Sequence, residues 1–336
     1  MPPVTLLREG WHRLQPAGDT ACALGDPYSF FVRPADPQRL LIYFQGGGAC
    51  WDGATCTPGG STTDQTVNAG DSPERGARGI FELDNEANPF RDYSMVYVPY
   101  CTGDVHLGDQ SVTYETAAGS LTIRHNGYNN AAAVLDWTFA NYTAPESVFV
   151  AGGSAGAIPT PFYAHLAAEQ YPTARITQLG DAAGGYRGDG LDGLLETWGT
   201  PALLARFPEY DLGREGLTFD SPYLATGRLH PEMQLAQYNT AYDTVQIFFL
   251  RLIGEAGINL PQLIRANDGD IAKQLDNYDS FLAGGSVHTI LQLEEFYTFQ
   301  ADGVRVRDWV AALEAGEAVD SVRCNDCTVV ERPGDS

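Results

Sequence analysis

The chain has 336 residues, of which 43% are hydrophobic and 19% are charged, a balance typical of a folded globular protein. Its formal net charge is −23, and Lys273 is its single lysine. Nucleic acid and anionic membranes should repel a chain this acidic, so we exclude both as expected partners. No apolar run approaches the roughly 18 residues that a membrane span requires.

The organisation of the chain is that of one domain. Residues 1–4 lack the basic-then-apolar pattern of a signal peptide, which leaves two interpretations: a cytosolic protein, or a secreted one whose signal has been removed. We find no internal repeat and no low-complexity linker. The sequence therefore predicts a single domain over residues 1–336, with elaborated loops.

Short apolar runs and helical patterns alternate along the first half of the chain. Strands are predicted at residues 39–44, 93–99, 147–151 and 176–179, and helices at residues 128–142 and 155–170. This alternation is the signature of an α/β fold, a mostly parallel sheet with helices on both faces. Residues 191–279 are mixed polar and aromatic with a strong helix at 240–253, and we expect a cap or lid there.

The pentapeptide GGSAG at residues 152–156 follows a predicted strand and precedes a predicted helix. That context is the nucleophile-elbow motif of the α/β-hydrolase-like fold, in which a tight turn exposes the serine hydroxyl. Ser154 is therefore the predicted nucleophile. An ordinary glycine-rich turn is the alternative.

A serine nucleophile needs a histidine base and a carboxylate that orients the base, and this fold supplies them in the order Ser, Asp or Glu, His. His165 lies in the same predicted helix as Ser154, and His230 precedes a proline in a polar loop. His288 follows a glycine pair in a late loop and is the predicted base. Asp181 and Asp243 both remain candidates for the acid.

The oxyanion of an ester hydrolase needs preorganised N–H donors. Three consecutive glycines, residues 46–48, end the first strong strand, and Ala155 follows the nucleophile. The backbone N–H groups of these residues are the predicted donors.

The number of cysteines is even: Cys22, Cys50, Cys56, Cys101, Cys324 and Cys327. Three disulfides would indicate an oxidising compartment, and the sequence does not choose among the 15 pairings that six cysteines allow. A zinc site is the less favoured alternative, because Cys324-x-x-Cys327 lacks a second ligand pair at the usual spacing.

Together these segments resemble the pectin acetylesterase / Notum carboxylesterase family. The resemblance is carried by QGGGACWD at residues 45–52, by YCTGDVHLG at 100–108, by GSAG at 153–156, and by Asp243 and Gln246. It implies a triad of Ser154, Asp243 and His288, with an oxyanion hole formed by Gly47, Gly48 and Ala155. It also implies a disulfide-bonded, secreted or periplasmic enzyme of bacterial type that uses no metal or other cofactor.

Other residues of the resemblance are candidates for the pocket. Trp51, Asp104 and His106 could line it, and Asp104 and His106 could instead hold the oxyanion loop or form a structural turn. The Notum branch has a tryptophan at the position of Gly48, so we do not expect its lipid-shaped pocket here.

The predicted function is hydrolysis of acetyl or other short-chain acyl esters, on a polysaccharide such as pectin, through an acyl-enzyme. A polyester hydrolase or general carboxylesterase with the same triad is one alternative. An inactive carbohydrate- or lipid-binding module on the same fold is another.

Overall fold

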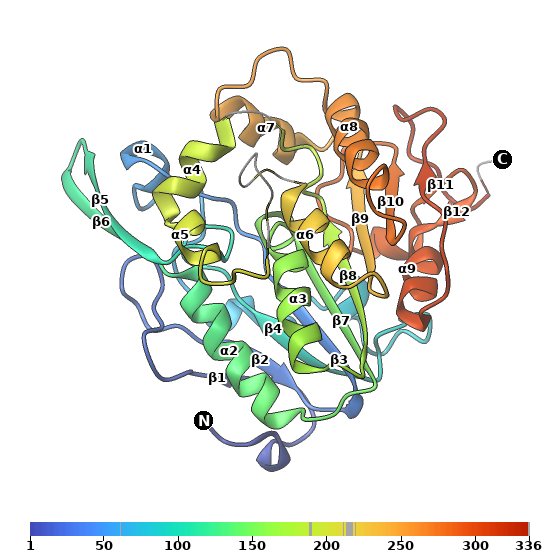
Figure 1. Ribbon diagram of the computed structural model, residues 1–336, viewed down its shortest axis with the longest axis horizontal. Helices are drawn as coiled ribbons and strands as arrows, with labels where there is room; N and C mark the ends of the chain where they lie inside the picture. Colours follow the sequence, from blue (N-terminus) through green and yellow to red (C-terminus); the bar gives the residue numbers. More distant parts are fainter. Residues whose placement is uncertain (61, 188–189, 211, 213–217, 219, 335–336) are drawn as a thin grey trace.

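The computed structural model describes residues 1–60, 62–187, 190–210, 212, 218 and 220–334. Within these residues the centre of the molecule is a nine-stranded sheet in the order β1-β2-β4-β3-β7-β8-β9-β10-β13 (Figure 1). The pairs β1–β2 and β2–β4 are antiparallel, and the other pairs are parallel. The strands are β1 His12–Leu14, β2 Phe30–Arg33, β3 Asp36–Phe44, β4 Tyr93–Val98, β7 Ser147–Gly153, β8 Arg175–Asp181, β9 Gln234–Thr240, β10 Tyr278–Ala283 and β13 Val322–Arg323.

Helices pack against this sheet. In Figure 1, α2 (Gly127–Asn141), α3 (Thr160–Gln170) and α6 (Ser221–Leu229) lie side by side in front of the strands. The other helices are α1 Gly53–Cys56, α4 Gly190–Trp198, α5 Thr200–Leu204, α7 Thr244–Leu252, α8 Leu260–Ala272 and α9 Val306–Ala315. The mostly parallel sheet with its helices confirms the predicted α/β-hydrolase-like fold class.

Shorter elements complete the chain. They are the hairpin of β5 (Gln110–Thr116) and β6 (Gly119–His125), the pair β11 (Gln300–Ala301) and β12 (Val304–Arg305), and the 3₁₀ turns η1 Val4–Leu6, η2 Ala69–Asp71, η3 Gly79–Phe81, η4 Ser154–Gly156 and η5 Glu294–Tyr297. The β5–β6 hairpin projects from one side of the molecule (Figure 1). None of the described helices is long and apolar enough to cross a bilayer.

The four predicted strands are confirmed as β3, β4, β7 and β8. Their central residues are fully buried because helices cover both faces, which is why they read as continuous apolar runs. The register pairs Phe44 of β3 with Gly152 of β7, and Gly153 of β7 with Asp181 of β8. The carboxyl ends of these strands therefore meet at one edge of the sheet.

The helix predicted at residues 155–170 is wrong in its start. The chain first makes the 3₁₀ turn η4, and α3 begins at Thr160. Pro159 accounts for the delay, because a proline disfavours helical backbone in the residue before it and has no N–H to donate.

The predicted cap region, residues 191–279, contributes largely to the main layers. It contains β9, a central strand whose buried Gln237 and Asn239 hid it from a search for apolar runs. Its first helix, α4, lies apart from the sheet and beside the β5–β6 hairpin (Figure 1).

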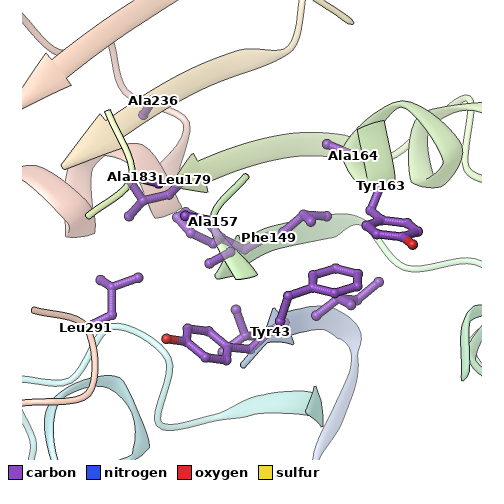
Figure 2. Close-up of a cluster of buried hydrophobic side chains, with 14 of the residues drawn as sticks. Tyr43, Phe149, Ala157, Tyr163, Ala164, Leu179, Ala183, Ala236 and Leu291 are labelled. Carbon is purple, nitrogen blue, oxygen red and sulfur yellow. The ribbon is translucent and has the colours of Figure 1, made fainter. Parts of the chain in front are cut away.

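The core fills the space on both faces of the sheet. Figure 2 shows part of it, with Tyr163 and Ala164 of α3, Phe149 of β7 and Tyr43 of β3 among the buried side chains. The ring of Tyr163 stacks on Phe44 with centroids 4.4 Å apart. This packing fixes the helix that follows the predicted nucleophile against the strands that carry the site.

Three disulfides join the six cysteines, as the even count predicted. Cys22 pairs with Cys101, Cys50 with Cys56, and Cys324 with Cys327. The last pair accounts for the C-x-x-C motif without a metal. The first spans 79 residues and ties the segment before β2 to the loop after β4.

The Cys22–Cys101 disulfide should contribute most to stability, because it closes the longest loop of the unfolded chain. We expect Cys22→Ala with Cys101→Ala to lower the free energy of unfolding by about 4 kcal/mol, and Cys324→Ala with Cys327→Ala by about 2 kcal/mol. Urea denaturation of both double variants measures this difference. Equal losses would contradict the loop-length explanation.

Candidate active site

Ser154 stands at a strained turn between β7 and η4. Its φ is 54°, in the left-handed region that residues with a side chain rarely adopt. The glycines on either side permit the turn: a Cβ at Gly152 would lie 2.1 Å from the carbonyl oxygen of Gly156, and a Cβ at Gly156 would lie 2.2 Å from that of Phe44. The backbone of the GGSAG pentapeptide thus has the geometry of a nucleophile elbow.

His288 and Asp243 form a hydrogen-bonded pair. His288 follows β10 in the loop that begins with Gly284 and Gly285, and Asp243 is the N-cap residue of α7. Nδ1 of His288 lies 2.7 Å from Oδ2 of Asp243. Because a carboxylate oxygen accepts, Nδ1 carries the proton, which leaves the Nε2 lone pair of the neutral ring free to act as a base.

Asp243 is fully buried, and further hydrogen bonds satisfy both of its carboxyl oxygens. Oδ1 accepts from the backbone N–H groups of Val245 and Gln246, at 2.9 and 3.1 Å, and Oδ2 accepts from the side-chain amide of Gln246 at 3.0 Å. The same residue therefore caps a helix and orients the histidine.

One cavity brings these groups together. Ser154 and His288 both line it, with Gly46, Gly47 and Gly48 on another side. The glycine loop comes close to the serine, since a Cβ built on Gly46 would lie 2.8 Å from the Cβ of Ser154. The polar groups that the sequence indicated as nucleophile, base and oxyanion loop thus share one small space.

Asp181, the alternative acid, has a different set of partners. Its Oδ2 accepts from the backbone N–H groups of Ile290 and Leu291, both at 2.8 Å. These residues lie in the loop just after His288, so the two hydrogen bonds anchor that loop to the end of β8. Burial raises the pKa of Asp181 to about 7 despite these two hydrogen bonds.

Asp104 and His106 lie behind the glycine loop and are both buried. Nε2 of His106 donates to the backbone carbonyl of Gln45 at 2.8 Å, and Asp104 accepts from the N–H groups of His106 and Gly127. Burial lowers the pKa of His106 to about 4, which keeps the ring neutral. Of the residues suggested for the pocket, Trp51 alone lines a cavity beside Ser154, and these two instead support the loop.

An apolar cavity opens on the other side of Ser154 and Ala155, and sequence reasoning did not foresee it. Trp51 and Val105 form part of its wall. Further apolar wall residues come from the turn after Ser154, from α4 and from α7 and its end: Ile158, Leu194, Leu195, Trp198, Phe249 and Ile253. The wall draws on residues between Gly48 and Ile253, so no local pattern could have marked them as one surface.

The mostly parallel sheet and the serine at a strained strand-to-helix turn define the α/β-hydrolase-like class of fold. The family model described as Pectinacetylesterase matches residues 12–187, just over half of the chain. The chain therefore belongs to the pectinacetylesterase family. The matched residues include the glycine loop and Ser154, and they end before Asp243 and His288.

Curated relatives are more distant. The chain is 25% identical to human palmitoleoyl-protein carboxylesterase NOTUM over 172 residues, which cover 48% of this chain and 33% of the relative. It is 27% identical to the mouse protein of that name over the same length and shares. The planarian Schmidtea mediterranea protein is 33% identical over 94 residues, 26% of this chain and 18% of the relative. The matches thus span at most a third of these relatives.

Because the pKa of Asp181 is raised in the folded protein, the free energy of unfolding should depend on pH. An ordinary aspartate titrates near pH 3.9, so between about pH 4 and pH 7 the folded protein binds more protons than the unfolded chain, and stability falls as pH rises through this window. Asp181→Asn keeps one oxygen acceptor and removes this dependence. We expect the variant to gain on the order of 1 to 4 kcal/mol relative to the wild type between pH 4 and pH 8.

Urea denaturation at about pH 4 and about pH 8 measures the stability that Asp181→Asn gains relative to the wild type. The exposed Asp136→Asn is the matched control and should follow the wild type at both. Parallel pH profiles for the wild type and Asp181→Asn would contradict the assignment.

Proposed function

We propose that the protein is a serine carboxylesterase with Ser154 as nucleophile, His288 as base and Asp243 as the acid that orients the base. One observation carries the proposal: the strained serine of the elbow shares a cavity with a histidine whose other nitrogen is bonded to a buried carboxylate. Serine, base and orienting acid in this relation are the elements of nucleophilic acyl transfer.

The first step forms an acyl-enzyme. Oγ of Ser154 attacks the ester carbonyl carbon while Nε2 of His288 takes the hydroxyl proton, and Asp243 stabilises the charged imidazolium. The tetrahedral intermediate then collapses, the bond to the alcohol oxygen breaks, and His288 gives its proton to that oxygen. Water then attacks the acyl-enzyme by the same route, with His288 as base, and releases the acid.

The oxyanion of each tetrahedral intermediate needs donors fixed in advance. We propose the backbone N–H groups of Gly47, Gly48 and Ala155. Two features support this choice: the glycine loop lies against Ser154, and His106 holds its first carbonyl in place. Gly48 has a φ of 77°, and a Cβ there would lie 2.0 Å from the carbonyl oxygen of Thr62, so this loop conformation requires glycine.

The proposed substrate is an acyl ester on a larger carrier. The family name supports acetyl groups on pectin or a similar polysaccharide. The apolar cavity beside Ser154 favours a second candidate, an ester of a longer hydrocarbon acid, because its wall offers few polar groups to bind a sugar. The relatives are named for a palmitoleoyl group, which is consistent with the second candidate. Hydrolysis of a polyester by the same triad remains an alternative.

The three disulfides support a protein that works in an oxidising compartment, and we propose that it is secreted or periplasmic. We also propose that residues 1–336 act as one domain, with α4 as a lid over the apolar cavity. Leu194 and Leu195 of α4 in the cavity wall support that role.

Replacing the nucleophile should abolish hydrolysis. We expect Ser154→Ala to lower kcat on p-nitrophenyl acetate by at least about 10⁴-fold, since the remaining triad members cannot act without it. Asp243→Asn should also lower kcat strongly, because the wrong tautomer of His288 would be favoured.

A fluorophosphonate probe separates the enzyme from an inactive binding module. The wild type should be labelled at Ser154, and Ser154→Ala should not. The surface variant Asp136→Asn is the control and should keep full activity and labelling. Turnover retained by Ser154→Ala would refute the proposed nucleophile.

The length of the acyl group can be read from a series of p-nitrophenyl esters. If the apolar cavity binds the acyl chain, kcat/KM should rise roughly threefold to fourfold for each CH₂ buried between acetate and octanoate. Leu195→Trp, which fills the cavity, should then lower kcat/KM for octanoate at least tenfold and leave acetate within about threefold.

Acetylated pectin and acetylated xylan complete the panel. A wild type that prefers acetate, together with release of acetate from either polymer, would favour the short-chain candidate and refute the long-chain one.

A further inference from the structure

A second cluster of chemically reactive side chains lies on the helices and outside both cavities that contain Ser154. His165 lies in the middle of α3, and His230 directly follows α6. Both are buried, and Nδ1 of His165 lies 2.9 Å from Nε2 of His230. Glu169 follows His165 by one turn of α3, and its carboxylate oxygen is 3.9 Å from the same nitrogen of His230. The mechanism proposed above uses none of these groups.

The three atoms have the spacing of ligands around one ion. The ring nitrogens and the Glu169 carboxylate oxygen all lie within 4.8 Å of one another. Zinc binds nitrogen and carboxylate oxygen at about 2.0 to 2.2 Å, so two of its ligand atoms lie about 3 to 3.5 Å apart. The histidine nitrogens are close to this separation. The exposed side chain of Glu169 needs only a rotation to reach it.

Each histidine also has a carboxylate behind its other nitrogen. Nε2 of His165 lies 3.8 Å from an oxygen of Glu209, and Nδ1 of His230 lies 3.8 Å from an oxygen of Glu232. Histidines that bind a metal almost always turn their second ring nitrogen to a carboxylate, carbonyl or water, which fixes the ring and makes it a better ligand. A simple hydrogen bond between two histidines does not need this arrangement on both sides.

The ring of His165 is also held in place by its neighbours. The ring packs against Tyr210 with centroids 5.1 Å apart, which restrains its orientation.

We propose that His165 Nδ1, His230 Nε2 and the carboxylate of Glu169 bind a divalent transition-metal ion of the zinc type, with water as the fourth ligand. Two imidazoles and one carboxylate suit zinc and its neighbours, whereas calcium and magnesium take sets of oxygen ligands. The ion joins α3 to the end of α6. Its role is structural: it fastens the helix that follows the nucleophile, and the ester chemistry does not depend on it.

Isothermal titration of the full chain with zinc chloride, disulfides intact, tests the site. We expect one ion per chain, with His230→Gln binding at least about 100-fold more weakly and Glu169→Gln about tenfold more weakly. Glu232→Gln, behind His230, should weaken binding about tenfold as well. At zinc concentrations about 100 times the Kd, the wild-type Tm should rise by roughly 3 to 6 °C, and that of His230→Gln should not.

Two controls keep the result specific. His12→Gln removes an exposed histidine outside the cluster and should bind zinc like the wild type, as should Ser154→Ala. Cobalt substituted for zinc should give the visible bands of a four-coordinate site in the wild type and lose them in His230→Gln. Esterase activity on p-nitrophenyl acetate should be the same for His230→Gln and the wild type, so the proposed function and this site can fail separately.

The absence of stoichiometric zinc binding to the wild type would overturn the proposal. Equal binding to the wild type, His230→Gln and Glu169→Gln would also overturn it, because the ion would then lie elsewhere. Glu169 is exposed, so its variant tests the site even if a change at the buried His230 prevents folding.

Discussion

The turn at the end of β7 is the constraint on which the site depends. Ser154 is held at a positive φ. The close packing of Gly152 and Gly156 against neighbouring carbonyl groups maintains this strained conformation. The same contacts bring the end of β3 against the end of β7. The glycine loop that follows β3 therefore lies beside the serine, and the position of one element fixes the other.

Three buried carboxylates organise the surroundings of this turn, and their partners give each a different task. Asp243 accepts four hydrogen bonds in all, from His288, Val245 and Gln246, and orients the histidine. Asp181 binds the loop after His288. Asp104 supports the segment that carries His106 and thus the glycine loop. Burying a carboxyl group is energetically unfavourable unless it accepts hydrogen bonds. Each of these three acids therefore holds in place the backbone N–H groups that donate to it.

The apolar cavity and the histidine cluster share one pair of helices, α3 and α6. The turn before α3 gives Ile158 to the cavity wall, and α3 itself carries His165 and Glu169. α6 packs along α3 and ends at His230. An ion at the cluster would therefore act on the same two helices, the first of which follows Ser154, and limit their relative movement.

The sequence alone determined the α/β fold class, the four central strands, the elbow at Ser154 and the roles expected of His288 and the glycine loop. These features are local, because an apolar run, a tight turn or a series of glycines depends only on residues that are adjacent in the sequence. It left open the acid, the cysteine pairing and the purpose of His165 and His230, and it missed β9 and the apolar cavity. The contact of Asp243 with His288 and the wall of the apolar cavity join residues far apart in the chain, which only the tertiary structure brings together: Asp243 reaches His288, 45 positions away, because β9 and β10 end side by side.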